Sequence, residues 1–339
     1  MRSQIPWLVF FLTLLLLAGI VVSLGVGAVM IPPQQVLRAL LSSDPSVNST
    51  HATIVWELRL PRILLASLVG AGLGVAGAGY QGLFRNPLAD PFIIGASSGA
   101  ALGATLAIVL GLQGSFLGLQ PIPVAALAGA LLAVTAVYGV ASIGSQVPIL
   151  SLLLAGVAVS SLIGSVVSLL MFLNDENLTT IFAWLMGSLS GRGWPVLKTT
   201  FPAIVLGGGI LWVLSRSLDS LTFGEESARS LGLRLERLRG LVVFAASLST
   251  AAAVAAGGII GFVGLIAPHI ARLLFSPRHA ILIPASGLVG AILLLVADNL
   301  ARTMAAPGEL PVGVVTALLG SPFFLYLLKT RQRELGRRS

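Results

Sequence analysis

The longest uncharged stretch of the sequence constrains the fold more than any other feature. From Pro91 to Asn174 the chain runs for 84 consecutive residues without one Asp, Glu, Lys or Arg. A soluble core of that size needs more polar surface than such a run can supply. A bilayer core about 30 Å thick, by contrast, is crossed by helices of roughly 20 apolar residues. The run therefore predicts about three membrane-spanning helices.

Apolar runs of similar length continue along the rest of the chain. Hydrophobic residues make up 56% of the 339 residues, and charged residues only 9%. The runs between charges and Pro/Gly turns predict ten spans, near residues 7–31, 61–83, 92–111, 121–141, 148–173, 195–215, 240–257, 259–275, 280–304 and 310–328. The eighth is the least regular, because glycines and Pro268 interrupt it. The sequence predicts an all-α polytopic membrane protein, with residues 1–339 as one transmembrane domain.

Charge asymmetry orients the predicted spans. An even number of spans puts both termini on one side, and the segments on that side carry fourteen of the twenty Lys and Arg residues. Because cytoplasmic loops are enriched in Lys and Arg, we expect both termini in the cytoplasm. The first apolar run is longer than the roughly 7–15 residues of a signal-peptide core, so we expect a retained span. The net charge of +8 then reflects cytoplasmic loops rather than nucleic-acid binding.

Few side chains suit enzymatic or metal chemistry. There are no cysteines, and the histidines His51, His269 and His279 are scattered, so we predict no metal site. Neither lysine lies in a G-x-x-x-x-G-K-[ST] loop, which excludes that kind of ATP site from this chain. GASSGA, residues 95–100, resembles the serine motif of intramembrane serine proteases, but packing of small residues explains it equally. We predict no catalytic residues.

An ion-coupled secondary carrier is the main alternative to an ATP-driven transporter. Such carriers bury ionisable residues near the middle of the membrane. The clearest candidate is Asp298 in LLLVADNLARTM, which Arg302 follows four residues later. Side chains four residues apart on a helix are neighbours, so we expect an Asp298–Arg302 ion pair near the outer surface. The carrier hypothesis stays open as the alternative.

The segment TFGEESARSLGLRLERLR, residues 222–239, is far more polar than the chain around it. Seven of its eighteen residues are charged. As a helix it has one apolar face, made by Phe223, Ala228, Leu231, Leu235 and Leu238. Glycines within it allow bends. The pattern fits either a solvated loop held by Glu–Arg pairs or a short helical hairpin that docks on a cytoplasmic partner.

The same segment and six further blocks, in order, resemble one family of membrane proteins. The blocks lie between about residue 55 and residue 329. They are ELRLPRILLASLVGAGLGVAGAGYQGLFRNPLADPFIIGASSGAALGA (57–104), LLLAGVAVS (152–160), WLMGSLSG (184–191), GFVGLIAPHIARLL (261–274), ADNLAR (297–302) and ELPVGVVTALLGSPFFLYLL (309–328). Through them the chain resembles the permeases of vitamin B12, haem and ferric-siderophore ATP-binding-cassette (ABC) importers, of the large ten-span type.

The resemblance implies an assembly rather than a lone transporter. Permeases of this family form homodimers with two cytoplasmic ATPase subunits, which supply ATP and Mg, while the permease itself binds no cofactor. An extracytoplasmic binding protein delivers the substrate. The resemblance further implies a bacterial or archaeal cell (inner) membrane and an inverted repeat of spans two to five and seven to ten. The expected cargo is a metal chelate (ferric siderophore, cobalamin or haem), with oxyanion import left open.

Two groups of residues match family positions, and the resemblance also assigns the translocation path to two of the spans. Residues 222–239 correspond to the coupling helices that contact the ATPase, through Gly224, Glu225, Ala228, Arg229, Leu231 and Gly232. RLPR and ADNLAR supply Arg59, Arg62 and Arg302, which in the B12 family member pair with acidic residues of the binding protein. The translocation path follows spans five and ten, with the polar residues Ser160, Ser161, Ser165, Ser168, Thr316 and Ser321.

The three arginines have a second interpretation, which is snorkelling of long side chains to the membrane surface. We favour docking, because positive charge is depleted on the outer side of a membrane protein and three arginines there require a reason.

Overall fold

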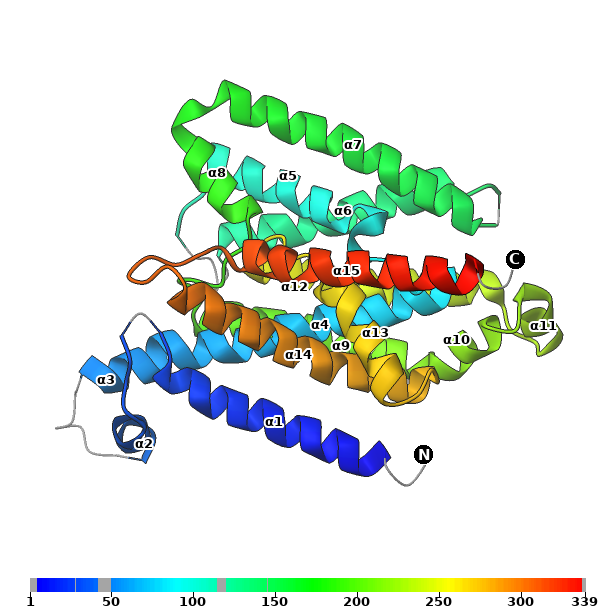
Figure 1. Ribbon diagram of the computed structural model, residues 1–339. Coiled ribbons are helices and arrows are strands. Elements are labelled where there is room, and N and C mark those ends of the chain that lie inside the picture. The colour runs from blue at the N-terminus through cyan, green and yellow to red at the C-terminus, as the bar shows by residue number, and fades with distance from the viewer. Residues whose placement is uncertain (1–4, 28, 42–49, 115–119, 145, 337–339) are drawn as a thin grey trace.

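The computed structural model describes residues 5–27, 29–41, 50–114, 120–144 and 146–336, and these ranges form a bundle of helices (Figure 1). In chain order the α-helices are α1 Ile5–Gly25, α2 Pro33–Leu41, α3 Thr50–Thr53, α4 Leu60–Phe84, α5 Ala96–Val109, α6 Pro121–Ala141, α7 Ile149–Leu173, α8 Leu178–Leu185, α9 Trp194–Val213, α10 Ser215–Leu221, α11 Glu225–Ser230, α12 Leu235–Gly257, α13 Val263–Leu274, α14 His279–Thr303 and α15 Val312–Gly336. A π-helix at Ile54–Arg59 leads into α4, and two 3-10 turns lie at Pro91–Ile94 and Asp175–Asn177.

Ten of these helices coincide with the ten predicted spans, namely α1, α4, α5, α6, α7, α9, α12, α13, α14 and α15. In the part of the chain that the structure describes, seven helices are long and apolar enough to cross a membrane, and α5, α13 and the apolar part of α15 are shorter. The prediction of an all-α polytopic membrane protein is confirmed.

The eighth span is irregular, as its glycines indicated. α13 has 12 residues, so at about 1.5 Å per residue it is too short to cross a bilayer core of about 30 Å. The residues before it, 258–262, are not helical, and Gly258 and Phe262 have φ angles of 73° and 67°. Non-helical backbone is tolerated at membrane depth where protein surrounds it. The chain therefore completes this span as a loop followed by a short helix.

Small residues bring α4 and α14 into close contact at the centre of the bundle. A Cβ at Gly70 would collide with the carbonyl oxygen of Gly290, and one at Gly290 would collide with that of Gly70. Gly99 of α5 and Gly129 of α6 face each other in the same way. In lipid, such approach of two backbones drives helix association through van der Waals contact.

The packing pairs repeat between the two halves of the chain. α4 packs on α13 and α14, and α12 packs on α5 and α6. α5 contacts α6 and α7, and α13 contacts α14 and α15. These are the pairs expected if α4–α7 and α12–α15 were two copies of one unit. The inverted repeat stays a prediction, and this pattern supports it.

The bundle has two polar ends. We call the arginine end the one that holds Arg59, Arg62 and Arg302. We call the α11 end the one that holds α10, α11 and the first turns of α12. α1 begins and α15 ends at the α11 end (Figure 1), as an even number of crossings requires.

Candidate functional site

The α11 end carries a short helical hairpin, residues 222–239, between α10 and the body of α12 (Figure 1). α11 is only six residues long. Gly224 and Gly232, which flank it, have φ angles of 105° and 79°. Backbone in this region costs a residue with a side chain about 1–3 kcal/mol. The bends expected at these two glycines are therefore confirmed, and the last five residues of the segment belong to α12.

Arg239 anchors this hairpin to the bundle. Its guanidinium group lies 2.7 Å from the Glu225 carboxylate and 2.9 Å from that of Glu236, and donates to the carbonyl oxygen of Val147 at 3.2 Å. Glu236 in turn accepts a hydrogen bond from the Val147 N–H at 3.1 Å. Because Val147 lies just before α7, one buried arginine joins α11, α12 and the start of α7. Sequence reasoning missed this role, although a Glu–Arg pair three residues apart on a helix signals it.

The apolar face expected along the hairpin is divided in the structure. The members that pack on the bundle are Ala228, Leu235 and Leu238. Phe223 and Leu231 are instead 79% and 70% exposed. The expectation of one face was wrong, because the two glycine turns break the helical periodicity between α10, α11 and α12.

The six residues predicted to contact an ATPase therefore occupy two kinds of position. Glu225 and Ala228 face the bundle, and the two glycines shape the turns. Arg229 and Leu231 are exposed. Of the six, only these two present exposed side chains to a partner. Phe223, earlier in the same hairpin, is also exposed. Contact with an ATPase stays a prediction.

A second contact attaches α10 to the start of α14. The Asp219 carboxylate accepts a hydrogen bond from the backbone N–H of His279 at 2.9 Å and lies 2.7 Å from its Nδ1. The imidazole is buried over Gly82, where a Cβ would collide with Nε2. No local pattern predicts this pair, because 60 residues separate its members.

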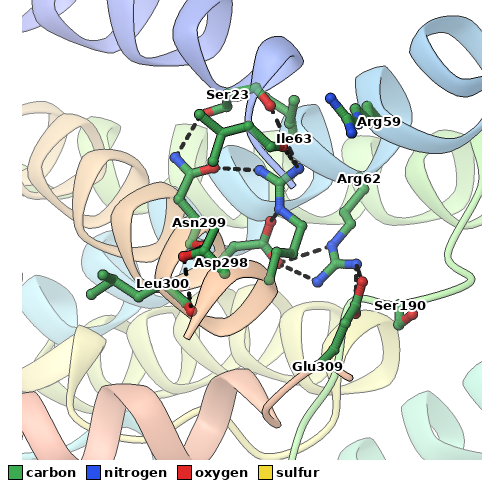
Figure 2. A network of polar contacts seen from close by, with 12 residues as sticks. Ser23, Arg59, Arg62, Ile63, Ser190, Asp298, Asn299, Leu300 and Glu309 are labelled. Atoms are coloured by element: carbon green, nitrogen blue, oxygen red, sulfur yellow. Dashed lines mark hydrogen bonds and ion pairs between the residues drawn. The ribbon is translucent and has the colours of Figure 1, made fainter. Parts of the chain in front are cut away.

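At the arginine end, Arg62 of α4 joins two other parts of the bundle (Figure 2). Its Nη2 lies 2.9 Å from Asp298 of α14, and its Nη1 lies 2.8 Å from Glu309 in the loop before α15. Asp298 is fully buried, and its second oxygen lies 3.1 Å from Nε of Arg302. The Asp298–Arg302 pair predicted from its spacing of four residues is confirmed.

The other guanidinium contacts are also internal. Arg302 donates to the carbonyl oxygen of Val26 at 2.9 Å and to the side-chain oxygen of Asn299. Asn299 donates in turn to the Ser23 hydroxyl of α1 at 2.7 Å (Figure 2). Arg59 donates to two backbone carbonyls at and beyond the end of α1. The arginine end thus ties α1, α4, α14 and the loop before α15 together.

Burial separates the two interpretations of these arginines. Arg59, Arg62 and Arg302 are 8%, 8% and 3% exposed. A snorkelling side chain carries its charge into water, so that interpretation is wrong here. Docking of a binding protein stays a prediction. An acidic residue of such a partner would have to share Arg62 with Glu309 or compete with backbone carbonyls.

α7, the first predicted path helix, is covered on one side by α5, α6 and α8. Ser161, Ser165 and Ser168 lie on its exposed side. Ser160 is half-buried, and its hydroxyl lies 3.3 Å from that of Ser98 on α5. Three of the four predicted serines are therefore accessible along α7.

α15, the second predicted path helix, packs on α13 and α14. Thr316 is buried and donates to the carbonyl oxygen of Gly313 at 3.0 Å. Ser321 is half-buried. This helix therefore offers less polar surface than its sequence suggested, because Thr316 is used within the helix.

Comparison with known proteins decides the family. The model of the FecCD transport family matches residues 15–330. The chain belongs to this family. The permease is 46% identical over 286 residues to the cobalamin import system permease protein BtuC of Halobacterium salinarum, across 84% of this chain and 76% of that one. It is 39% identical to the hemin transport system permease protein HmuU of Yersinia pestis, across 98% of both chains.

The fold agrees with the family. A solved structure described as an inward-facing metal-chelate-type ABC transporter has a TM-score of 0.83 and 38% identity, across 96% of this chain and 99% of that one. The protein is a membrane permease of the ABC-importer type. The serine-protease interpretation of GASSGA is thereby wrong, and Ser98 donates a hydrogen bond to the carbonyl oxygen of Gly95 at 3.0 Å.

Proposed function

We propose that this permease is the membrane subunit of an ATP-driven importer of metal chelates, and that a partner ATPase drives alternating access. The observation that carries the proposal is the hairpin at the α11 end, where an exposed polar surface is fastened to the bundle by a buried arginine. A transporter without its own nucleotide site needs such a contact to receive force. The cargo follows from relatives named for cobalamin and hemin import.

In this proposal the α11 end is cytoplasmic, and each of two ATPase subunits binds one hairpin. Phe223, Arg229 and Leu231 enter a groove of the ATPase. When the ATPase subunits close on ATP, displacement of α11 passes through Glu225 to Arg239 and on to the start of α7. Separating Arg239 from its carboxylates is costly, because Arg239 is buried and its charge would be left uncompensated. The pair therefore moves as a unit, and α7 moves with it.

The path for the cargo lies between two copies of the permease. α7 presents an uncovered side with the serines described above and with large apolar side chains, among them Leu154, Leu162 and Leu169. No charged residue occurs in α7. Such a surface suits a second copy and a bulky chelate that slides past it, and it suits a small, strongly hydrated oxyanion less well.

The arginine end is extracytoplasmic in this orientation and receives the solute-binding protein. Acidic residues of that protein would compete with Glu309, which is one-third exposed, for the Nη1 of Arg62. Docking would then loosen the tie between α4 and the loop before α15.

The ion-coupled carrier is the alternative, and the state of Asp298 argues against it. The carboxylate is buried, and both of its oxygens are already engaged, one by Arg62 and the other by Arg302. Carriers use an intramembrane acid that can lose and regain its ion.

Uptake into proteoliposomes tests the proposal. The permease is purified in mild detergent after cross-linking in cells, and the co-purifying ATPase and binding protein are identified by mass spectrometry. The three components are then reconstituted and supplied with cobalamin, hemin, a ferric siderophore or molybdate. We expect ATP-dependent uptake of one chelate. Uptake by the permease without its partners, under an ion gradient, would support the carrier instead. Uptake of molybdate and of none of the chelates would contradict the proposed cargo.

A further inference from the structure

An apolar groove is lined by residues of α1, α4, α9 and α14. Of these helices, α1 lies on the opposite side of the bundle from α7 (Figure 1). The volume of the groove is about 930 Å³. The α4 and α14 walls include the small residues Ser67, Ala71, Gly287 and Ala291. The groove exists because α1 and α9 flank α4 and α14 without closing over these small side chains.

Two tryptophans place the groove at the depth of the acyl chains. Trp194 begins α9, lines the groove, and donates its indole N–H to the carbonyl oxygen of Trp56 at 3.0 Å. Trp212, near the other end of α9, donates to the carbonyl oxygen of Ala280 at 3.1 Å. Tryptophan gathers at the two membrane interfaces. The groove begins at the Trp194 boundary and extends inward, so hydrocarbon rather than water faces it.

Lys198 is the one charged residue among those that line the groove. It is exposed, and no carboxylate pairs with it in the part of the chain that the structure describes. Lys198 follows Trp194 by one helical turn, so its flexible stem reaches the membrane boundary. Pro202 has no N–H, which deprives the Lys198 carbonyl of its usual helical donor. Within the described residues, the ammonium group of Lys198 at the rim of the groove thus has no anionic partner. The carbonyl oxygen of Lys198 lacks its helical hydrogen-bond donor.

We propose that the groove is a binding site for one anionic phospholipid. One acyl chain lies along α4 and α14, and the headgroup phosphate pairs with Lys198. A headgroup hydroxyl, as in phosphatidylglycerol, supplies a donor for the carbonyl. A zwitterionic lipid fills the groove less well, because its own cation competes for the phosphate. The inference depends on membrane insertion alone and not on the cargo or the ATPase.

Fluorescence quenching by brominated lipids tests the site. In a single-tryptophan variant, Trp194 is kept and Trp7, Trp56, Trp184 and Trp212 are replaced by Phe. The full chain is reconstituted in phosphatidylcholine vesicles that contain either brominated phosphatidylglycerol or brominated phosphatidylcholine. One lysine near an anionic headgroup contributes about 1 kcal/mol, which favours binding of phosphatidylglycerol over phosphatidylcholine about fivefold. We expect brominated phosphatidylglycerol to show that preference in its quenching of Trp194. When Trp212 is the retained tryptophan, the two brominated lipids should quench it about equally.

Two variants separate headgroup from acyl chain. Lys198→Ala should remove the preference for phosphatidylglycerol at Trp194 and leave quenching by phosphatidylcholine intact. Ala71→Leu narrows the groove and should reduce quenching by both lipids. A preference that persists in Lys198→Ala would overturn the phosphate contact, and unchanged quenching in Ala71→Leu would overturn the acyl-chain position. Gel filtration and circular dichroism confirm that each variant is folded.

Discussion

The arginine end and the α11 end both contain a buried arginine network, but they differ in where the remaining charge goes. At the arginine end all three guanidinium groups point inward, onto Asp298, Glu309 and backbone carbonyls. At the α11 end one arginine points inward and its neighbours stay exposed. The first arrangement locks helices together, and the second holds a projecting surface in place.

Burial determines how much stability is lost when a member of each network is substituted. Taking charges out of water is expensive, so a buried pair adds little stability in itself, yet removing one member is costly. Asp298 is completely shielded, whereas Glu225 and Glu236 are about one-third exposed and can be hydrated when their partner is lost. The two ends should therefore respond very differently to substitution.

The largest effect is expected for Asp298→Ala. The change leaves Arg62 and Arg302 buried without their shared carboxylate, and breaking a buried pair costs about 3–5 kcal/mol. Thermal unfolding in detergent should show a large fall in Tm. Glu309→Ala is the matched control, since its carboxylate is partly hydrated and its loss should cost less. Equal falls in Tm for the two variants would contradict the claim that burial sets the cost of losing a carboxylate.

A smaller loss of stability and a larger loss of coupling are expected for Arg239→Met. Hydrogen bonds to charged groups are worth about 1.5–3 kcal/mol, and hydration of the two glutamates offsets part of that. In proteoliposomes, ATP hydrolysis should continue while uptake falls. Arg237→Met, at an exposed neighbouring position, should preserve both activities. Normal uptake by Arg239→Met would remove Arg239 from the transmission path.

Leu231→Asp should leave the bundle intact and prevent ATPase binding. An exposed position far from packing contacts changes stability by no more than about 0.5 kcal/mol. A pull-down of the ATPase, run beside a Tm measurement, separates these outcomes. Full retention of the ATPase would show that Leu231 lies outside the contact.

The smallest effect is expected for Arg59→Gln at the arginine end. Glutamine keeps a polar amide at this position but is too short to replace both guanidinium hydrogen bonds. It leaves no buried charge unpaired, so the loss of stability should be smaller than for Asp298→Ala. Loss of the positive charge should weaken capture of the binding protein modestly, and most strongly at low salt, where charges are least screened. Unchanged affinity at every ionic strength would leave Arg59 with a structural role only.

The sequence by itself determined the order and approximate bounds of the apolar helices. This is possible because a helix in lipid satisfies its own backbone hydrogen bonds, so local composition and length suffice to place it. Local spacing also predicted the Asp298–Arg302 pair and the bends at Gly224 and Gly232. All of these features lie within one helix or one turn.

The tertiary structure decided which charges meet and which surfaces remain free. Arg62 pairs with a residue 236 positions away, and Asp219 with one 60 positions away. The apolar residues of the hairpin divide between core and surface for the same reason. A helical pattern tells which side chains share a face, but the neighbour that covers that face depends on how all the helices pack.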